Sequence, residues 1–408
     1  MKKYLFILAA AALGFASCSN DDVVSENQSL ADANTISFRP LIDGATRAAT
    51  ASNVTSLNSF YVTAFKTTNP YGTAYINDVQ YTNNGSGTYY KDGTSAATNK
   101  YANEYYWPTS GTLDFYAYNK PTNGVSAQTY HTYTLTPATS DNSTYDDVVY
   151  ATLQGCGKDD APSGTHYGTN GVPLNFRHTA SKIMVNFKNT SANLKFDVEG
   201  WQVGYLDPVG NFTLNETTTA GQDANQLAIG DWDTGTNTKS IATKYTSTFS
   251  STTVNANTST GTDLGGIVGS FILVPQRVTA ATAYTGHTAA PADGISTGED
   301  LNGSYIAVKL KIKDSTSGET IADDGSGNAI WVVWPIGDNG SETFNWLPGK
   351  QYTYTIDLAG GGYYPKNNGL INPDENTLDP ILSGAVIKFV NVTVDSWSDA
   401  SDVNVTMP

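Results

Sequence analysis

Short segments in which apolar and polar residues alternate predict that this chain is built mainly from β-strands. A period of two places alternate side chains on opposite faces of a strand, whereas a helix needs a period of 3.6. In the clearest segment Ile306, Val308, Leu310 and Ile312 share one face, while Lys309, Lys311 and Lys313 share the other. Leu113, Phe115 and Ala117 alternate similarly, as do Tyr352, Tyr354, Ile356 and Leu358. No body segment of ten or more residues keeps a helical period, roughly the minimum for a helix.

The pattern predicts an all-β protein with two antiparallel β-sandwich domains in tandem. Roughly sixteen candidate strands fit two sandwiches of about seven strands each. Residues 154–171 are rich in Gly, Asp, Pro and Ser, so we expect the domains to divide there, as 48–171 and 172–408. Residues 207–262 are rich in Thr, Asn and Gly and poor in apolar residues, and we expect long turns with one strand near residues 241–249.

The first residues predict export. Lys2 and Lys3 precede an apolar stretch, residues 4–13, that is too short to cross a bilayer, which takes about 20 residues. Small residues then precede Cys18, as in a bacterial lipobox. Ordinary signal cleavage explains the basic and apolar parts but not the cysteine. We therefore favour a signal peptide over residues 1–17 and a lipid on Cys18, which would hold the precursor at the outer membrane. The acidic residues Asp21 and Asp22 resemble a surface-export tag, or form a plain tether.

Residues 18–47 form a predicted propeptide that contains one strand. Ile36 and Phe38 alternate with polar residues, and Pro40 is expected to end that strand. Arg47 follows in a stretch of small residues, where it is either an ordinary surface arginine or a site for an arginine-specific protease that would cut between Arg47 and Ala48.

Charge and cysteine content limit the partners. The formal net charge is −16, so binding of nucleic acid through phosphate neutralisation is not expected. Of the two cysteines, only Cys156 remains for the folded body. It lies between glycines, and we expect an incidental thiol in a loop.

The residues that usually carry chemistry form no recognisable site. None of the four histidines has a second histidine or a cysteine at metal-ligand spacing. The acidic doublets, such as Asp323-Asp324, lie in Gly- or Ser-rich stretches typical of solvated turns. We expect no catalytic residues, no metal and no cofactor, and therefore no enzyme.

A series of motifs in order along the chain resembles the fimbrillin family of Bacteroidetes, the subunits of type V pili. The series comprises the lipobox at Cys18, Thr35-Ile-Ser-Phe, Ala45-Thr-Arg-Ala, Leu57-Asn-Ser-Phe-Tyr-Val-Thr-Ala-Phe, Tyr106-Trp-Pro, Leu174-Asn-Phe-Arg-His-Thr-Ala-Ser-Lys-Ile, Leu273-Val-Pro-Gln, Trp346-Leu-Pro-Gly-Lys-Gln-Tyr-Thr-Tyr-Thr-Ile and Val394-Asp-Ser-Trp.

The resemblance implies two transthyretin-like β-sandwich domains and cleavage after Arg47, which removes the strand around Ile36 and Phe38. The vacated groove then accepts a strand from the next pilin subunit. By position the donor is the C-terminal tail, with Val403, Val405 and Met407 on one face. That tail is short, so it either serves as donor or finishes the second domain, as a tip or capping subunit would require.

Two hypotheses follow. The first is a structural and adhesive pilus subunit at the cell surface, whose host or bacterial ligand the sequence does not name. The second is a glycan-binding lipoprotein that stays anchored through Cys18 and does not polymerise.

Overall fold

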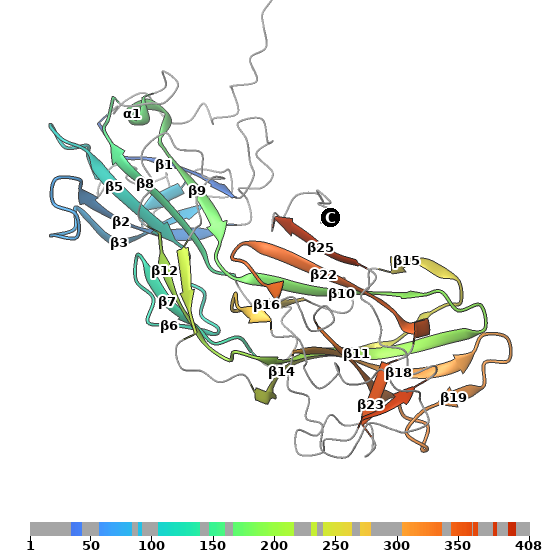
Figure 1. Ribbon diagram of the computed structural model, residues 1–408. Coiled ribbons are helices and arrows are strands. Elements are labelled where there is room, and N and C mark those ends of the chain that lie inside the picture. Colours follow the sequence, from blue (N-terminus) through green and yellow to red (C-terminus); the bar gives the residue numbers. More distant parts are fainter. Residues whose placement is uncertain are drawn as a thin grey trace, which may run out of the picture.

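The computed structural model describes residues 34–42, 57–83, 89–91, 105–138, 147–159, 166–215, 230–234, 240–262, 270–278, 304–336, 344–360, 362–365, 378–381 and 391–396. Within these residues the protein is almost entirely β, which confirms the predicted fold class. The one α-helix in this part of the chain is the four-residue α1 (Tyr167–Asn170). No helix in the described part is long and apolar enough to cross a membrane. Figure 1 shows the strands in an N-terminal half at the upper left and a C-terminal half at the lower right.

The N-terminal half is built on a seven-stranded sheet with the order β1-β9-β8-β5-β2-β3-β4. Its strands are β1 (Phe38–Ile42), β2 (Ser59–Lys66), β3 (Ile76–Asn83), β4 (Tyr89–Lys91), β5 (Leu113–Tyr118), β8 (Val149–Cys156) and β9 (Val172–His178). β1 and β9 run parallel, whereas the other neighbours are antiparallel.

This sheet curls around its own core. Phe38 of β1 lies with its ring centroid 4.8 Å from that of Tyr81 in β3, although four strands separate β1 from β3 in the sheet order. The contact is possible only because the twisted sheet brings its two ends together around one core. That core contains buried residues from β1, β9, β8, β5, β2 and β3, together with Trp107 and Tyr167.

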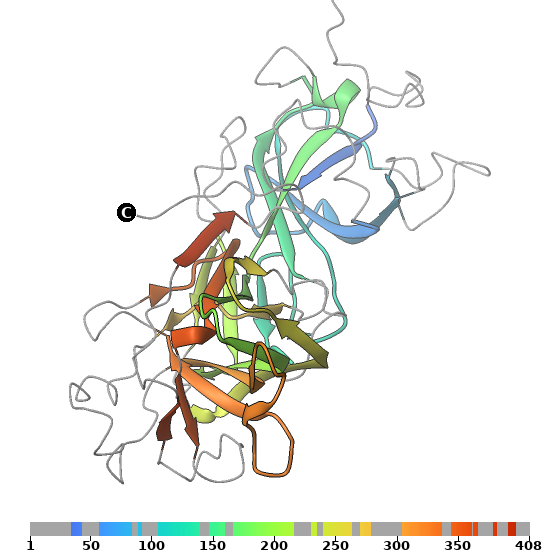
Figure 2. The ribbon, with the colours of Figure 1, turned by 90° about the vertical axis from the view of Figure 1, so that its right-hand side faces the viewer.

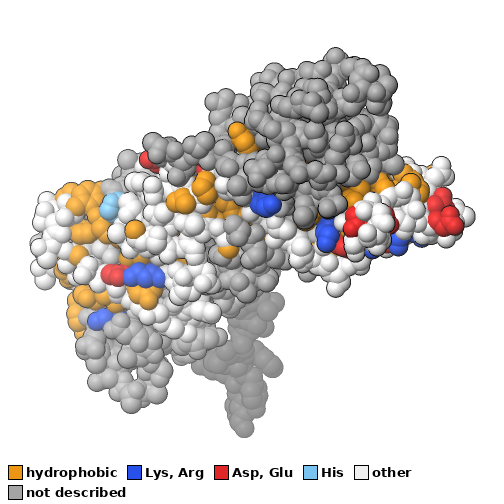
Figure 3. Space-filling view, turned by 90° about the horizontal axis from the view of Figure 1, so that it is seen from below, with side chains coloured by type: hydrophobic (Ala, Val, Ile, Leu, Met, Phe, Trp, Pro, Cys, Tyr) orange, Lys and Arg blue, Asp and Glu red, His pale blue; other side chains and the backbone are white. Residues whose placement is uncertain are grey.

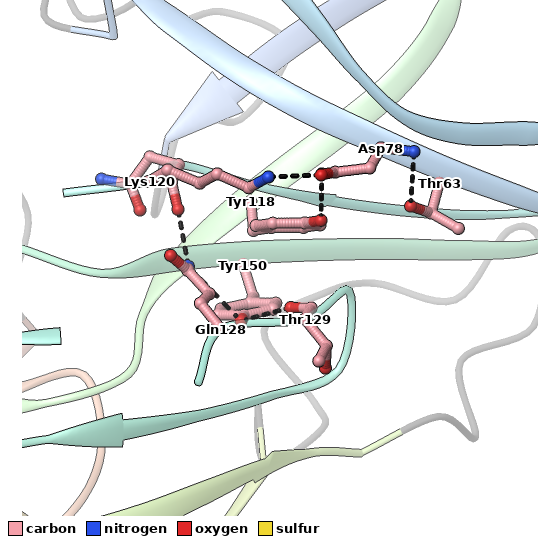
Figure 4. Close-up of polar contacts among 8 residues, drawn as sticks. Thr63, Asp78, Tyr118, Lys120, Gln128, Thr129 and Tyr150 are labelled. Atoms are coloured by element: carbon pink, nitrogen blue, oxygen red, sulfur yellow. Dashed lines mark hydrogen bonds and ion pairs between the residues drawn. The ribbon is translucent and has the colours of Figure 1, made fainter. Parts of the chain in front are cut away.

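A four-stranded sheet covers the opposite face of the N-terminal sheet. It consists of β13 (Gly230–Asp233), β12 (Gly210–Leu214), β7 (Thr132–Leu135) and β6 (Val125–Ser126), in that order. Between the sheets, polar contacts accompany a second core rich in tyrosine. Figure 4 shows one of them: the Tyr150 hydroxyl donates to the Thr129 carbonyl over 2.8 Å. It also shows the ion pair of Lys120 with Asp78, which joins β3 to the end of β5 within the N-terminal sheet.

The C-terminal half is a sandwich of two sheets around a third core. One sheet has the order β15 (Thr258–Thr262), β10 (Ser181–Asn189), β22 (Lys350–Asp357) and β25 (Asn391–Ser396), and β16 (Phe271–Leu273) also pairs with β10. The facing sheet contains β14 (Ser240–Val254), β11 (Leu194–Leu206), β18 (Tyr305–Asp314), β20 (Ile330–Pro335), β23 (Gly362–Pro365) and β24 (Leu378–Ile381), with β19 (Thr320–Ala322) beside β18. A short pair, β17 (Arg277–Val278) and β21 (Phe344–Asn345), lies apart, and η5 (Leu358–Gly360) follows β22. Figure 2 shows this half below the N-terminal half.

The alternating patterns are confirmed in this half. On β18 the side chains of Ile306, Val308, Leu310 and Ile312 are buried, whereas the three lysines between and after them are partly exposed. Two of those lysines, Lys309 and Lys311, lie 3.6 Å from Glu199 of β11, and Lys313 lies 2.5 Å from Asp197. Figure 3 shows charged side chains of both signs beside one another on this half.

Three local expectations were wrong. Residues 207–262 contain β12, β13, β14 and β15 rather than one strand, because Thr and Ser side chains suit half-exposed strands that pair with an apolar neighbour. β1 continues through Pro40 to Ile42, since a strand at the edge of a sheet tolerates a residue without an N–H. Cys156 is not in a loop; it ends β8 and is fully buried.

The chain first passes from the N-terminal half to the C-terminal half at residues 179–181, between β9 and β10, and it returns to the N-terminal half at β12 and β13. β9 lies beyond residue 171 but pairs with β8 and β1, so the N-terminal sheet continues past the expected division. Thr179 is fully buried here, and its hydroxyl donates to the Val148 carbonyl over 2.8 Å. The indole of Trp232 donates to the Thr179 carbonyl, also over 2.8 Å. From the C-terminal half, the Leu347 carbonyl accepts a hydrogen bond from the Ser181 hydroxyl over 2.9 Å, so groups from both halves hold the junction.

Candidate functional site

The most unusual feature of the N-terminal half is the segment of residues 34–42, which contains β1 and which we call the β1 segment. It precedes residues 43–56, where Arg47 lies, yet it packs into the core formed by the chain after that stretch. We call the groups that hold it the β1 seat: β9, residues 105–107, and the side chains of Phe60, Tyr81 and Phe115.

β9 forms the first wall of the seat. The parallel register runs from Phe38 opposite Val172 to Ile42 opposite Phe176, and the Val172 amide donates to the Ser37 carbonyl over 2.8 Å. β1 is the end strand of its sheet, so this ladder holds it on one side. Without β1, the backbone groups of β9 that face it would lie at an open sheet edge, which is a template for another strand.

Residues 105–107 form the second wall at the other end of the segment. The Ile36 amide donates to the Tyr105 carbonyl over 2.8 Å, and the Trp107 amide donates to the Asn34 carbonyl over 2.7 Å. Thr35 and Tyr106 form the antiparallel bridge between these two bonds. The β1 segment therefore changes backbone partner along its length, from residues 105–107 to β9.

Two apolar side chains of the segment fill the core. Ile36 is fully buried and Phe38 is 8% exposed. The Phe38 ring lies edge-on to three aromatic rings, with centroid distances of 4.8 Å to Tyr81, 5.6 Å to Phe115 and 6.1 Å to Phe60. Burial of a large apolar side chain contributes about 1.5–3 kcal/mol. These two residues are thus a substantial part of what holds the segment in place.

Gly171 lets the backbone of the β1 segment lie close to the start of β9. Its φ is +74°, a conformation that glycine adopts without steric cost. A Cβ at this position would lie 3.2 Å from the Ser37 hydroxyl oxygen and 3.4 Å from the Ser37 carbonyl oxygen. A side chain at residue 171 would therefore press directly on the segment.

Tyr89 lies beside the seat, with its ring centroid 5.0 Å from that of Phe60. Burial raises the pKa of Tyr89 to about 12, and a hydrogen bond with Asn83 only partly offsets this. Tyr89 is therefore a neutral hydroxyl that donates to the Leu57 carbonyl over 2.7 Å. Such a seat binds through backbone hydrogen bonds and apolar contacts, which suits a β-strand.

The described residues contain no cluster of three or more His, Cys, Asp or Glu side chains that could hold a metal ion. His178, at the end of β9, is paired with Asp147 near the junction. This agrees with a structural role for His178 near a strand end.

Of the residues that the sequence singled out, the structure places Ile36 and Phe38 side by side in the seat. Cys18, Arg47, Ala48, Val403, Val405 and Met407 lie outside the described residues. The last described strand, β25, ends at Ser396, whose partner Lys350 is also opposite Ser181 at the junction. The chain after β25 thus starts near the middle of the molecule.

Sequence reasoning missed most of the seat. Trp107 was visible as part of a Trp-Pro pair, but nothing indicated that residues 105–107 bind the β1 segment. Gly171 stood just before an apolar strand, which is a signal for a special backbone conformation, although not for its contact with Ser37.

A sequence model described as fimbrillin-like matches residues 46–397. This chain belongs to the fimbrillin-like family. The β1 segment lies before the matched range. No curated protein sequence matches the chain.

Several solved structures are similar to this fimbrillin-like chain. A fimbrial protein from Bacteroides vulgatus is 12% identical, with 90% of this chain and 100% of that chain covered and a TM-score of 0.45. A candidate cell adhesion protein from Bacteroides ovatus is 16% identical, with coverage of 90% and 99% and a TM-score of 0.42. The C-terminally truncated tip fimbrial protein Mfa3 from Porphyromonas gingivalis is 11% identical, with coverage of 84% and 94% and a TM-score of 0.32.

Proposed function

We propose that this protein is a structural and adhesive subunit of a type V pilus at the cell surface, with no catalytic activity of its own. In this proposal it is exported as a lipoprotein, acylated at Cys18 and held at the outer membrane. An arginine-specific protease cuts after Arg47, the β1 segment leaves, and a strand of another subunit takes its place. Membership of the fimbrillin-like family supports the pilus role.

The β1 seat is the observation that supports the replacement of the β1 segment by a strand of another subunit. β1 is an end strand, and Ile36 and Phe38 of the β1 segment complete a core that otherwise comes from residues after the proposed cut. Cleavage at Arg47 would leave this segment attached only by non-covalent contacts. Its departure would expose the edge of β9 together with an apolar pocket, and an alternating strand satisfies both.

The groups that contact the β1 segment also favour a binding role over chemistry. They are backbone amides and carbonyls and aromatic rings, none of which is arranged as a nucleophile with a base. Export and lipidation rest on the sequence of residues 1–18.

The test is controlled cleavage of the purified precursor. We expect an arginine-specific protease to yield a chain that begins at Ala48 and then forms a ladder of oligomers on a non-reducing gel without heating. The matched control is Arg47→Lys, which keeps the charge but removes the cleavage site, and which should remain monomeric.

Clean cleavage at Arg47 without any oligomer would contradict polymerisation by this chain alone. Mass spectrometry of protein taken from the native cell surface distinguishes the pilus subunit from the alternative function. A chain that still begins at acylated Cys18 would instead support the anchored, glycan-binding lipoprotein.

A further inference from the structure

We propose that the β1 seat selects a strand with an aromatic residue in the place of Phe38, so that a subunit carrying such a strand binds more tightly than the tail of a second copy of this chain. The inference rests on the proposed strand exchange and specifies which strand is accepted.

The pocket for Phe38 is shaped by aromatic rings. The rings of Tyr81, Phe115 and Phe60 surround Phe38 at centroid distances of 4.8–6.1 Å, each within 12° of perpendicular to it. Edge-to-face pairs of this kind are favourable beyond the area they bury. Each of the three rings comes from a different strand, so the pocket cannot shrink by moving one loop.

The tail of this chain offers no aromatic residue to that pocket. Its apolar positions are Val403, Val405 and Met407, at a spacing of two. If Val403 takes the place of Ile36, then Val405 takes the place of Phe38 and Met407 that of Pro40, because β1 residues on one face are two apart. Valine in place of phenylalanine leaves much of the pocket empty.

The other registers of the tail also bring no aromatic ring to the pocket. With Met407 in the place of Phe38 and the strand in the same direction as β1, Pro408, which has no backbone N–H, takes the place of Arg39. In neither direction do residues 398–408 supply an aromatic residue.

The β1 segment, by contrast, fills both apolar places and keeps the whole ladder with β9. Ile36 is fully buried, Phe38 occupies the aromatic pocket, and the ladder continues to Ile42. An unfilled cavity of this kind weakens binding by roughly ten- to a hundredfold. A strand that resembles Ile36-Ser-Phe38 is therefore the better ligand, and this chain's tail is a weak one.

The test uses the full chain cut after Arg47, with the released segment removed. Four peptides compete with a fluorescent copy of residues 34–43: unlabelled residues 34–43, residues 398–408, and the latter with Val405→Phe or Val403→Phe. We expect Val405→Phe to bind at least tenfold more tightly than the unchanged tail peptide.

Val403→Phe is the matched control, with the same added ring two residues earlier. Shifting that ring into the pocket would put Ser401 in the place of Ile36. We therefore expect no gain in affinity from this peptide.

The outcomes separate the two proposals. If residues 34–43 bind but Val405→Phe binds no better than the unchanged tail, selection of an aromatic residue is wrong while strand exchange stands. If both phenylalanine peptides gain equally, the ring adds only general hydrophobicity and the inference also fails. If residues 34–43 do not bind the cut protein at all, the proposed exchange itself is contradicted.

Discussion

The cores of the two halves differ in where their residues come from. The C-terminal core is formed by residues between Ile183 and Leu358, all of which lie after the stretch that contains Arg47. The N-terminal core needs Ile36 and Phe38, which are separated from the rest of it by the stretch that contains Arg47. A single cut there would leave the first core dependent on a detachable segment and the second core covalently unchanged.

The substitution with the largest expected effect tests this difference between the two cores directly. Phe38→Ala should destabilise the uncut precursor by about 3–5 kcal/mol, because it empties the aromatic pocket. The same substitution should have no effect on protein that has been cut after Arg47 and separated from the segment. Urea unfolding of the cut and uncut forms measures both.

Phe187→Ala is the control from the C-terminal core, where Phe187 is fully buried. It should destabilise the cut and uncut forms equally. A loss of stability in the cut form of Phe38→Ala would mean that the β1 segment had not left.

A smaller effect is expected at Gly171. Gly171→Ala combines a positive φ, which costs about 1–3 kcal/mol for other residues, with the contact to Ser37. Gly111→Ala has the same backbone problem, at a φ of +84°, but open space around the new methyl group. We expect Gly171→Ala to lower the stability of the precursor more than Gly111→Ala, as measured by urea unfolding. The additional destabilisation by Gly171→Ala should disappear after cleavage, when Ser37 has left with the β1 segment. If the additional destabilisation is unchanged, the strain does not involve the segment.

A pH-dependent effect is expected in the C-terminal half at Asp197. Burial acts to raise the pKa of Asp197, but hydrogen bonds from Lys313 and Thr253 and nearby lysine charges outweigh it, so the pKa is lower than usual. The carboxylate therefore stabilises the fold above its unfolded pKa of about 3.9, and that contribution is lost as the pH falls through the lower folded pKa. The melting temperature of the natural protein should exceed that of Asp197→Asn at pH 7. The difference in melting temperature should disappear below about pH 4. A difference that is constant with pH would contradict this prediction.

The smallest effect is expected in the N-terminal half at His131. Burial lowers the pKa of His131 below its usual 6.5, since the charged form is poorly solvated. The unfolded chain then takes up a proton more readily, so stability decreases as the pH falls through about 6.5. His131→Gln cannot take up that proton, and its melting temperature should change less between pH 7.5 and 5.5 than that of the natural protein, by roughly a degree or two. Equal changes would exclude His131 as the cause. The N-terminal half would thus respond to mild acid, and the Asp197 contribution only to stronger acid.

The alternation of residues predicted the strands that form the cores of both halves. β18 and β22 followed from the sequence because each has one apolar face against a core. β14 was predicted only in part, as a strand near residues 241–249, because Ser240–Val254 is rich in Thr and Ser and carries too few apolar residues to show a period of two along its length. Its position depends on its partner β11, which supplies the apolar residues Val198, Trp201 and Val203.

The β1 seat was only partly predictable. The strand around Ile36 and Phe38 was visible, and its placement as a removable element came from a family resemblance. Its pairing with β9 joins residues more than 130 positions apart, and local sequence carries no signal for such a contact. The same holds for the contact of the segment with residues 105–107.

The short passage from β9 to β10 also has a mechanical consequence. Tension that enters β10 through residues 179–181 acts along a strand that runs parallel to β22, from Ser181 opposite Lys350 to Lys188 opposite Asp357. Force directed along paired strands loads their hydrogen bonds together as shear, whereas force across them opens the bonds one at a time. Tension along this path would therefore be resisted by a whole ladder of hydrogen bonds at once.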